Sequence, residues 1–197
     1  MVVTPMNCNC GSNPTCPEHG VSLIEVLVTT VILAIGLLGL AGLQMRLQSS
    51  ELESYQRAQA LILLEDMANR LAANRTNVAS YVTASPLGVG DGQLSSCVGA
   101  GQTFDACQWS NALKGASEQS ASSTNVGAMI GARGCIEDLG TGEQFMITVV
   151  WQGQTPIAAP ASNCAIGIYD SAGTSCINDL CRRTMSTIVR IADLASP

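Results

Sequence analysis

The stretch Gly20-Val21-Ser22-Leu23-Ile24-Glu25 opens the apolar run that decides the fold of this chain. The run covers residues 21–43, and Glu25 is its single ionisable residue. A helix of that length, rising about 1.5 Å per residue, crosses the roughly 30 Å hydrocarbon core of a bilayer. A carboxylate in that core costs about 2.5–3.5 kcal/mol on insertion scales, so we expect Glu25 to serve a function.

The helix is expected to continue into water, because residues 44–75 contain no helix breaker. From residue 60 onward, apolar residues recur with helical spacing, which favours a face packed on a C-terminal domain over a partner-binding face. This stripe consists of Ala60, Leu61, Leu64, Met67, Ala68, Leu71 and Ala72. Residues 44–59 are mostly polar, and we expect neighbouring subunits, rather than the domain of the same chain, to cover them.

Composition and charge argue against several functions. The chain of 197 residues is long enough for one domain besides the long helix, or for at most two small units. The formal charge is −6 and Lys and Arg are scattered singly, which argues against the clustered basic face that nucleic acid requires. The only histidine, His19, precedes the apolar run, so the domain behind that run has no Ser/His/Asp or Cys/His arrangement. We therefore expect neither an enzyme nor a cofactor-binding protein.

The cysteines divide at Gly20, with three before it and six after it. The six are Cys97, Cys107, Cys135, Cys164, Cys176 and Cys181. An even number in a small, loop-rich domain predicts a disulfide framework in an oxidising compartment such as the periplasm, in preference to free cytosolic thiols. Six cysteines allow 15 pairings, and the sequence does not choose among them. The short separations suggest Cys97–Cys107 and Cys176–Cys181, which would leave Cys135 to pair with Cys164.

The residue pattern behind the helix predicts a small domain over residues 76–197, which makes the fold class α+β. The expected elements are a helix at Phe104–Leu113 and antiparallel strands at Met129–Asp138, Phe145–Gln152 and Thr184–Ala192. Residues 139–142 predict a hairpin turn between the first two strands. Chain breakers indicate a connector at residues 74–91, and residues 156–181 are expected to form a loop stapled by cysteines.

Two groups of residues have the chemistry of metal ligands. One group flanks the hairpin turn and consists of Glu137, Asp138 and Glu143. A solvated turn is favoured there over a calcium site, because the spacing of an EF-hand loop is absent. The other group precedes the apolar run and consists of Cys8, Cys10, Cys16 and His19. Its spacing fits no standard zinc finger, so a discarded leader is favoured over a zinc site.

Gly20, followed by an apolar run with glutamate as its fifth residue, resembles the processing site of type IV pilins and pseudopilins. The longer stretch at residues 21–75, VSLIEVLVTTVILAIGLLGLAGLQMRLQSSELESYQRAQALILLEDMANRLAANR, resembles the PilV-type minor pilins. In that family the Leu-Ile-Glu-Val-Leu-Val start, the Gly-Leu-Leu-Gly-Leu-Ala-Gly run and the closing Ala-Asn-Arg recur together. The resemblance implies the pilin fold, a long N-terminal helix packed on a small antiparallel sheet.

The resemblance also implies how the chain is processed and where it goes. Residues 1–20 would be a leader that the prepilin peptidase removes by cutting after Gly20, before it methylates the amine of Val21. The mature chain would be a helix at residues 21–75, anchored by residues 21–43 in the inner membrane, with a periplasmic domain at residues 76–197. Its partners would be other minor pilins and the major pilin, with which it initiates or modifies a type IV pilus.

Glu25 has a physical role in such an assembly. In a helix bundle without water, its carboxylate can be offset by the N-terminal ammonium of a neighbouring subunit. Pairing with the ammonium of the same chain is strained, because a straight helix carries Glu25 about 6 Å along the axis from Val21.

Two rival functions remain: a minor pseudopilin at the tip of a type II secretion system, and a tip-exposed adhesive subunit. The pseudopilin shares the helix and its mechanism. The role of Gly36, Gly39 and Gly42 is also open between two readings. They are either ordinary glycines of a membrane helix or a weak point that melts when subunits pack into a fibre.

Overall fold

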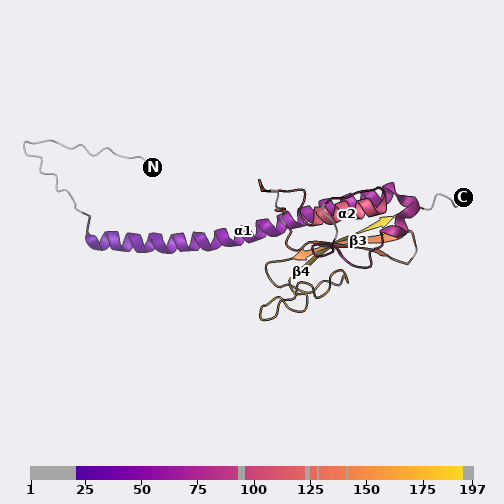
Figure 1. Cartoon of the computed structure of the whole chain (residues 1–197). Coiled ribbons are helices and arrows are strands. Elements are labelled where there is room, and N and C mark those ends of the chain that lie inside the picture. The colour runs from indigo at the N-terminus through magenta and orange to yellow at the C-terminus, as the bar shows by residue number, and fades with distance from the viewer. Residues whose placement is uncertain (1–20, 93–95, 123–124, 128, 141, 193–197) are drawn as a thin grey trace, which may run out of the picture. The chain divides into compact units, whose positions relative to one another are not determined.

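The computed structural model describes residues 21–92, 96–122, 125–127, 129–140 and 142–192. The chain divides into two compact units, one up to Arg46 and one from Leu47 onward. Helix α1, Leu23–Ala73, contributes to both units (Figure 1). Its ends lie within two residues of the helix that the sequence predicted at residues 21–75.

The second unit has a four-stranded sheet in which each strand is antiparallel to its neighbours, in the order β1-β2-β3-β4. The strands are β1 at Leu87–Gly88, β2 at Arg133–Asp138, β3 at Gln144–Gln152 and β4 at Arg182–Arg190. β2 and β3 form the predicted hairpin, and β3 pairs with β4 continuously from Gln144↔Arg190 to Gln152↔Arg182. The α+β class predicted from the pattern is therefore confirmed.

The connector and the strand ends differ from the prediction. Residues 74–91 contain a 3₁₀ helix, η1 at Arg75–Tyr81, and the short strand β1. β2 begins at Arg133 and not at Met129, because Gly131 turns the chain with a φ of +62°. β4 begins at Arg182 and ends at Arg190, two residues ahead of the prediction at both ends.

The second unit buries one stripe of α1 against the sheet and against α2, Gln102–Leu113. The buried residues of α1 are Gln56, Ala60, Leu63, Leu64, Met67 and Leu71. Leu61 and Ala72, which the prediction placed in this stripe, are exposed. At 3.6 residues per turn they point roughly 100° and 120° away from Ala60, which is fully buried at the centre of the contact.

Trp109 joins α2 to both α1 and the sheet. Its indole N–H donates to the carbonyl oxygen of Leu63 at 2.9 Å, and its ring lies on Gly134 of β2. A Cβ atom at Gly134 would lie 2.1 Å from Cη2 of Trp109, so only glycine allows this close approach. The two helices thus cover one face of the sheet, and a smaller cluster lies on the other face, formed by Cys135, Val150, Cys164, Ala165 and Tyr169.

Candidate functional site

The predicted processing site lies at the boundary of the described residues. Gly20 and the rest of the predicted leader, with Cys8, Cys10, Cys16 and His19, lie outside them. Val21 is the first described residue and is exposed, and α1 begins two residues later at Leu23. Cleavage after Gly20 stays a prediction.

Glu25 lies in the first turn of α1. Its backbone N–H donates to the carbonyl oxygen of Ser22 at 3.0 Å, which closes that turn. A carboxylate near a helix N-terminus interacts favourably with the helix dipole, by about 0.3–1 kcal/mol at an exposed site. That gain is smaller than the cost of a charge in hydrocarbon, so Glu25 needs a further partner in an apolar environment.

The other polar side chains of the segment Leu23–Leu43 are already satisfied. The hydroxyls of Thr29 and Thr30 donate to the carbonyl oxygens of Val26 and Leu27, each at 2.9 Å. No hydrogen bond or ion pair of the Glu25 carboxylate is present among the residues that the structure describes. Glu25 is thus the polar side chain of this segment that no described residue satisfies.

No residue that the structure describes buries the apolar side chains of residues 21–43. Every described residue from Val21 to Leu43 is exposed except Gly42, which is half-buried. α1 is long and apolar enough to cross a membrane. A Cβ atom built at Gly36, Gly39 or Gly42 would meet nothing within 4 Å, so the described residues provide no close packing at these glycines. The two readings of these glycines both stay open.

The mostly polar segment 44–59 corrects one expectation, because the domain of the same chain covers part of it. Glu53 forms an ion pair with Arg183 of β4, with Oε1 of Glu53 and Nε of Arg183 2.9 Å apart. The hydroxyl of Tyr55 donates to Glu118 at 2.6 Å, which raises the pKa of Tyr55, and Gln56 is buried. The sequence missed these contacts because their partners lie more than 60 residues away.

A second polar network ties the end of α1 to α2 and η1. Arg70 donates to Asp66, to Asp105 at 2.9 Å and to Gln108 at 2.8 Å. The hydroxyl of Tyr81 donates to the other oxygen of Asp105. Burial, together with this hydrogen bond, raises the pKa of Tyr81. Burial lowers the pKa of Arg70, but the hydrogen bonds and charges of the two aspartates outweigh it and leave that pKa raised.

The six cysteines form three disulfides, and the pairing is the one that the separations predicted. Cys97 bonds to Cys107, Cys135 to Cys164 and Cys176 to Cys181. The first ties the segment before α2 to α2 itself, and the second ties β2 to the loop between β3 and β4. Disulfides of this kind form and persist in oxidising compartments.

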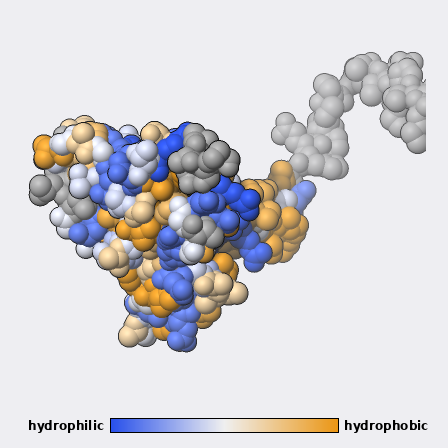
Figure 2. Space-filling view, turned by 90° about the vertical axis from the view of Figure 1, so that its right-hand side faces the viewer, coloured by the Kyte–Doolittle hydropathy of each residue, from blue (hydrophilic) through white to orange (hydrophobic). Residues whose placement is uncertain are grey.

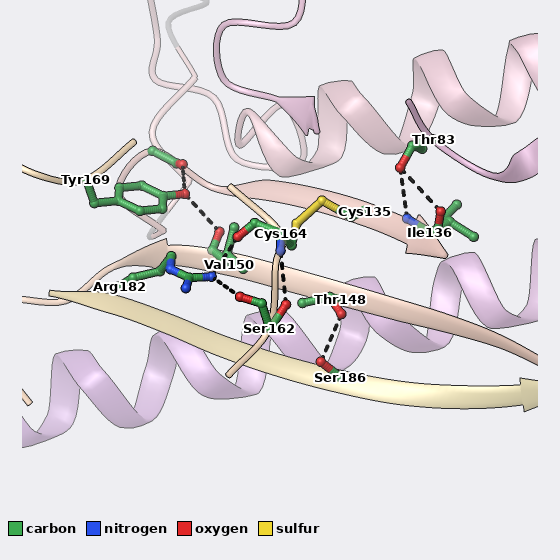
Figure 3. Close-up of a disulfide and its surroundings, with 11 residues drawn as sticks. Thr83, Cys135, Ile136, Thr148, Val150, Ser162, Cys164, Tyr169, Arg182 and Ser186 are labelled. Atoms are coloured by element: carbon green, nitrogen blue, oxygen red, sulfur yellow. Dashed lines mark hydrogen bonds between the residues drawn. A yellow bond between two sulfur atoms is a disulfide. The ribbon is translucent and has the colours of Figure 1, made fainter. Parts of the chain in front are cut away.

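Arg182 organises the loop between β3 and β4, and sequence reasoning missed this residue. Its guanidinium donates to both carboxylate oxygens of Asp179 and to the carbonyl oxygens of Pro160, Ser162 and Cys164. The Arg182 side chain is 2% exposed, and its five acceptors hold the loop against the start of β4. Figure 3 shows Arg182 beside Ser162 and Cys164. No local sequence pattern predicts this role of Arg182, because most of its acceptors are backbone carbonyls, which every residue has.

The three acidic residues considered as calcium ligands flank the hairpin turn, and Asp138 is engaged by the backbone of that turn. Asp138 accepts the backbone N–H groups of Gly140 at 2.9 Å and Gly142 at 3.2 Å, so its carboxylate closes the turn. Glu137, its neighbour on β2, points to the other face of the sheet because side chains alternate along a strand. Among the described residues, no three His, Cys, Asp or Glu side chains converge on one point.

One comparison with known proteins bears on the first unit. Residues 17–41 match the family described as the prokaryotic N-terminal methylation motif. The match spans the predicted cleavage point, Glu25 and the start of α1. No curated protein and no solved structure matches the chain.

The matched motif is of the prepilin type, and it supports a type IV pilin-like or pseudopilin subunit. It implies processing by a prepilin peptidase and assembly with other pilins, and it points to a structural subunit and not to an enzyme. The apolar start of α1 is consistent with anchoring in a membrane before incorporation into a pilus.

Proposed function

We propose that this chain is a minor pilin of the PilV type, which takes part in initiating or modifying assembly of a type IV pilus. The observation that carries the proposal is the prepilin-type motif at residues 17–41, placed where an exposed apolar helix begins. The motif would be the site on which the peptidase acts. The helix provides an apolar surface that only a membrane or other apolar helices can cover.

In this proposal the prepilin peptidase cuts after Gly20 and methylates the new amine of Val21. Residues 21–43 then anchor the subunit in the inner membrane, with the disulfide-bonded domain in the periplasm. During assembly the Glu25 carboxylate pairs with the ammonium of a neighbouring subunit, either another minor pilin or the major pilin. The unsatisfied carboxylate of Glu25 and the satisfied hydroxyls of Thr29 and Thr30 support this role.

Substitution of Glu25 tests the mechanism. Glu25→Gln keeps the size and the hydrogen-bonding capacity of the side chain but removes its charge. We expect membrane insertion to be unchanged, and pilus number and cross-linking to other pilins to fall to the level of a strain without this protein. Glu65→Gln is the matched control, because it removes an exposed charge from the same helix outside the apolar segment.

The N-terminus tests the processing step independently of assembly. Mass spectrometry of the protein in sheared pili should find a peptide that begins at methylated Val21. An intact leader on protein in the filament, or normal piliation with Glu25→Gln, contradicts the proposal. A deletion strain that keeps its pili but loses type II secretion would instead favour the pseudopilin, which shares the motif.

A further inference from the structure

A groove runs along one side of the Cys135–Cys164 disulfide, on the sheet face opposite α1. Its volume is about 360 Å³, within the range of roughly 300–1,000 Å³ typical of binding pockets. The disulfide forms part of its lining, the connector at residues 83–86 forms one side and the loop at residues 163–168 forms the other. Glu137, which shares a strand face with Cys135, contributes the groove's only ionised side chain.

Both sides of the groove are held in place by bonds to the sheet. Thr83 donates its backbone N–H to the carbonyl of Ile136, and its hydroxyl oxygen accepts the N–H of Ile136, both at 3.0 Å. On the other side, Arg182 holds the carbonyls of Ser162 and Cys164, and Tyr169 donates its hydroxyl to Val150 (Figure 3). A site that is rigid before binding loses less entropy when it is filled.

The Glu137 carboxylate has no ion-pair or hydrogen-bond partner within the described part of the chain. Arg133, the basic residue on the same face of β2, is already engaged. It donates to the carbonyl of Gly131 at 3.2 Å and lies over the ring of Tyr169, with its Cζ atom 5.4 Å from the ring centroid. The groove therefore carries one negative charge that nothing in these residues neutralises.

Apolar side chains border this charge. Ile166 and Ile168 line the groove and are 57% and 45% exposed, and Pro86 lies on the opposite side. Apolar residues are interspersed with polar ones over the visible surface of the second unit, so exposure alone marks no site (Figure 2). The groove is distinguished by two features together. Its apolar sides are held in place by hydrogen bonds to the sheet, and the Glu137 carboxylate between them has no partner among the described residues.

We propose that this groove docks a lysine or arginine side chain from a neighbouring pilin subunit. The alkyl stem lies along Ile166 and Ile168, while the cationic head pairs with Glu137 and hydrogen-bonds the free amide of Asn163. Long basic side chains bury their stems on apolar surface while the head stays paired or hydrated, which matches this lining. The choice of a pilin as the partner rests on the proposed function, whereas the basic chemistry rests on the groove.

A photo-reactive residue in place of Ile166, in cells carrying the full chain, tests the docking. We expect an adduct with another pilin whose cross-linked peptide contains lysine or arginine. Glu137→Gln should lower the adduct yield about fivefold, as expected for a partly exposed charge pair worth about 1 kcal/mol. Added salt should lower the yield for the wild type and not for Glu137→Gln.

The controls separate this inference from the proposed function. Glu65→Gln removes an exposed charge outside the groove and should leave the adduct unchanged. If the wild-type chain is in sheared pili but its adduct is equally strong with Glu137→Gln, or its partner peptide has no basic residue, the docking proposal is wrong. If the wild-type chain is never found in pili, the proposed function fails first.

Discussion

The two parts of α1 differ in whether their apolar residues are buried and in whether their carboxylates are paired. In the segment Leu23–Leu43, every side of the helix is apolar and exposed, and the single carboxylate has no partner among the described residues. In the segment Glu53–Leu71, one stripe is buried, and the carboxylates of Glu53 and Asp66 pair with arginines. A helix that is apolar all round needs cover from outside, whereas an amphipathic one finds it in its own domain.

The largest effect that would sharpen this comparison comes from truncating one leucine in each part. Leu64→Ala leaves a cavity in the core and should lower the free energy of unfolding of the domain by about 2–5 kcal/mol. Leu37→Ala, at a side chain 64% exposed, should leave it unchanged. Denaturant unfolding of the full chain in detergent, followed by tryptophan fluorescence, measures both. Equal losses would mean that the first part is also packed within the monomer.

The disulfides of the second unit should differ in how much they stabilise it. Replacing Cys135 and Cys164 with serine opens a loop with a sequence separation of 29 and should cost about 3.6 kcal/mol by chain entropy. Replacing Cys176 and Cys181, separated by five residues, should cost about 2 kcal/mol. Denaturant midpoints of the two double variants test the order, and the reverse order would contradict it.

Two arginines of α1 offer a matched pair for charge. Arg70 donates to three acceptors on two elements. Arg70→Met should lower the free energy of unfolding by about 1–2 kcal/mol, because Asp105 then keeps only its hydrogen bond from Tyr81. Arg57 is 58% exposed and lies 3.9 Å from Glu53, so Arg57→Met should change stability by less than about 0.5 kcal/mol. Thermal unfolding compares them, and equal effects would show that the network around Asp105 adds nothing.

The smallest effect concerns pH. Burial raises the pKa of Tyr169, whose hydroxyl donates to the carbonyls of Gly131 and Val150. A raised folded-state pKa means that its contribution is fully present below pH 10 and is lost as the pH rises through that raised value. Denaturant unfolding at about pH 9.5 and about pH 11 measures this effect. Between these two pH values, Tyr169→Phe should lose less free energy of unfolding than the wild type. If the free energy of unfolding of Tyr169→Phe falls with pH as steeply as that of the wild type, other groups cause the loss of stability at alkaline pH.

Much of this architecture could be predicted because its signals are local. The exposed apolar start of α1 follows from an apolar run whose single ionisable residue is Glu25. α2 and the strands follow from periodicity, and the hairpin follows from its turn residues. The short separations suggested the disulfide pairing that the structure has, but the sequence left all 15 pairings of six cysteines open. The stripe on α1 was right in period, but its centre was placed too far toward Leu61.

The remaining contacts depend on groups that are distant in sequence. Glu53 and Arg183 meet across 130 residues, and no spacing rule connects them. β1 has only two residues and exists because β2 offers it a partner. The reasoning that assigned Glu137 to a solvated turn could not know that this residue shares a groove with residues 83–86 and 163–168.

The sequence by itself determined that α1 begins in an apolar segment with one carboxylate, because hydrophobicity and length act without tertiary context. It also determined that the six cysteines follow that segment in a domain of mixed helix and strand. Only the tertiary structure decided which charges are satisfied. Arg183 and Asp105 are bonded from different elements, and Arg182 is bonded from several points of one loop. In contrast, Glu25 and Glu137 keep carboxylates that no described residue of the chain reaches. Whether a charge has a partner depends on distances of a few ångströms between segments, and the fold alone sets those distances.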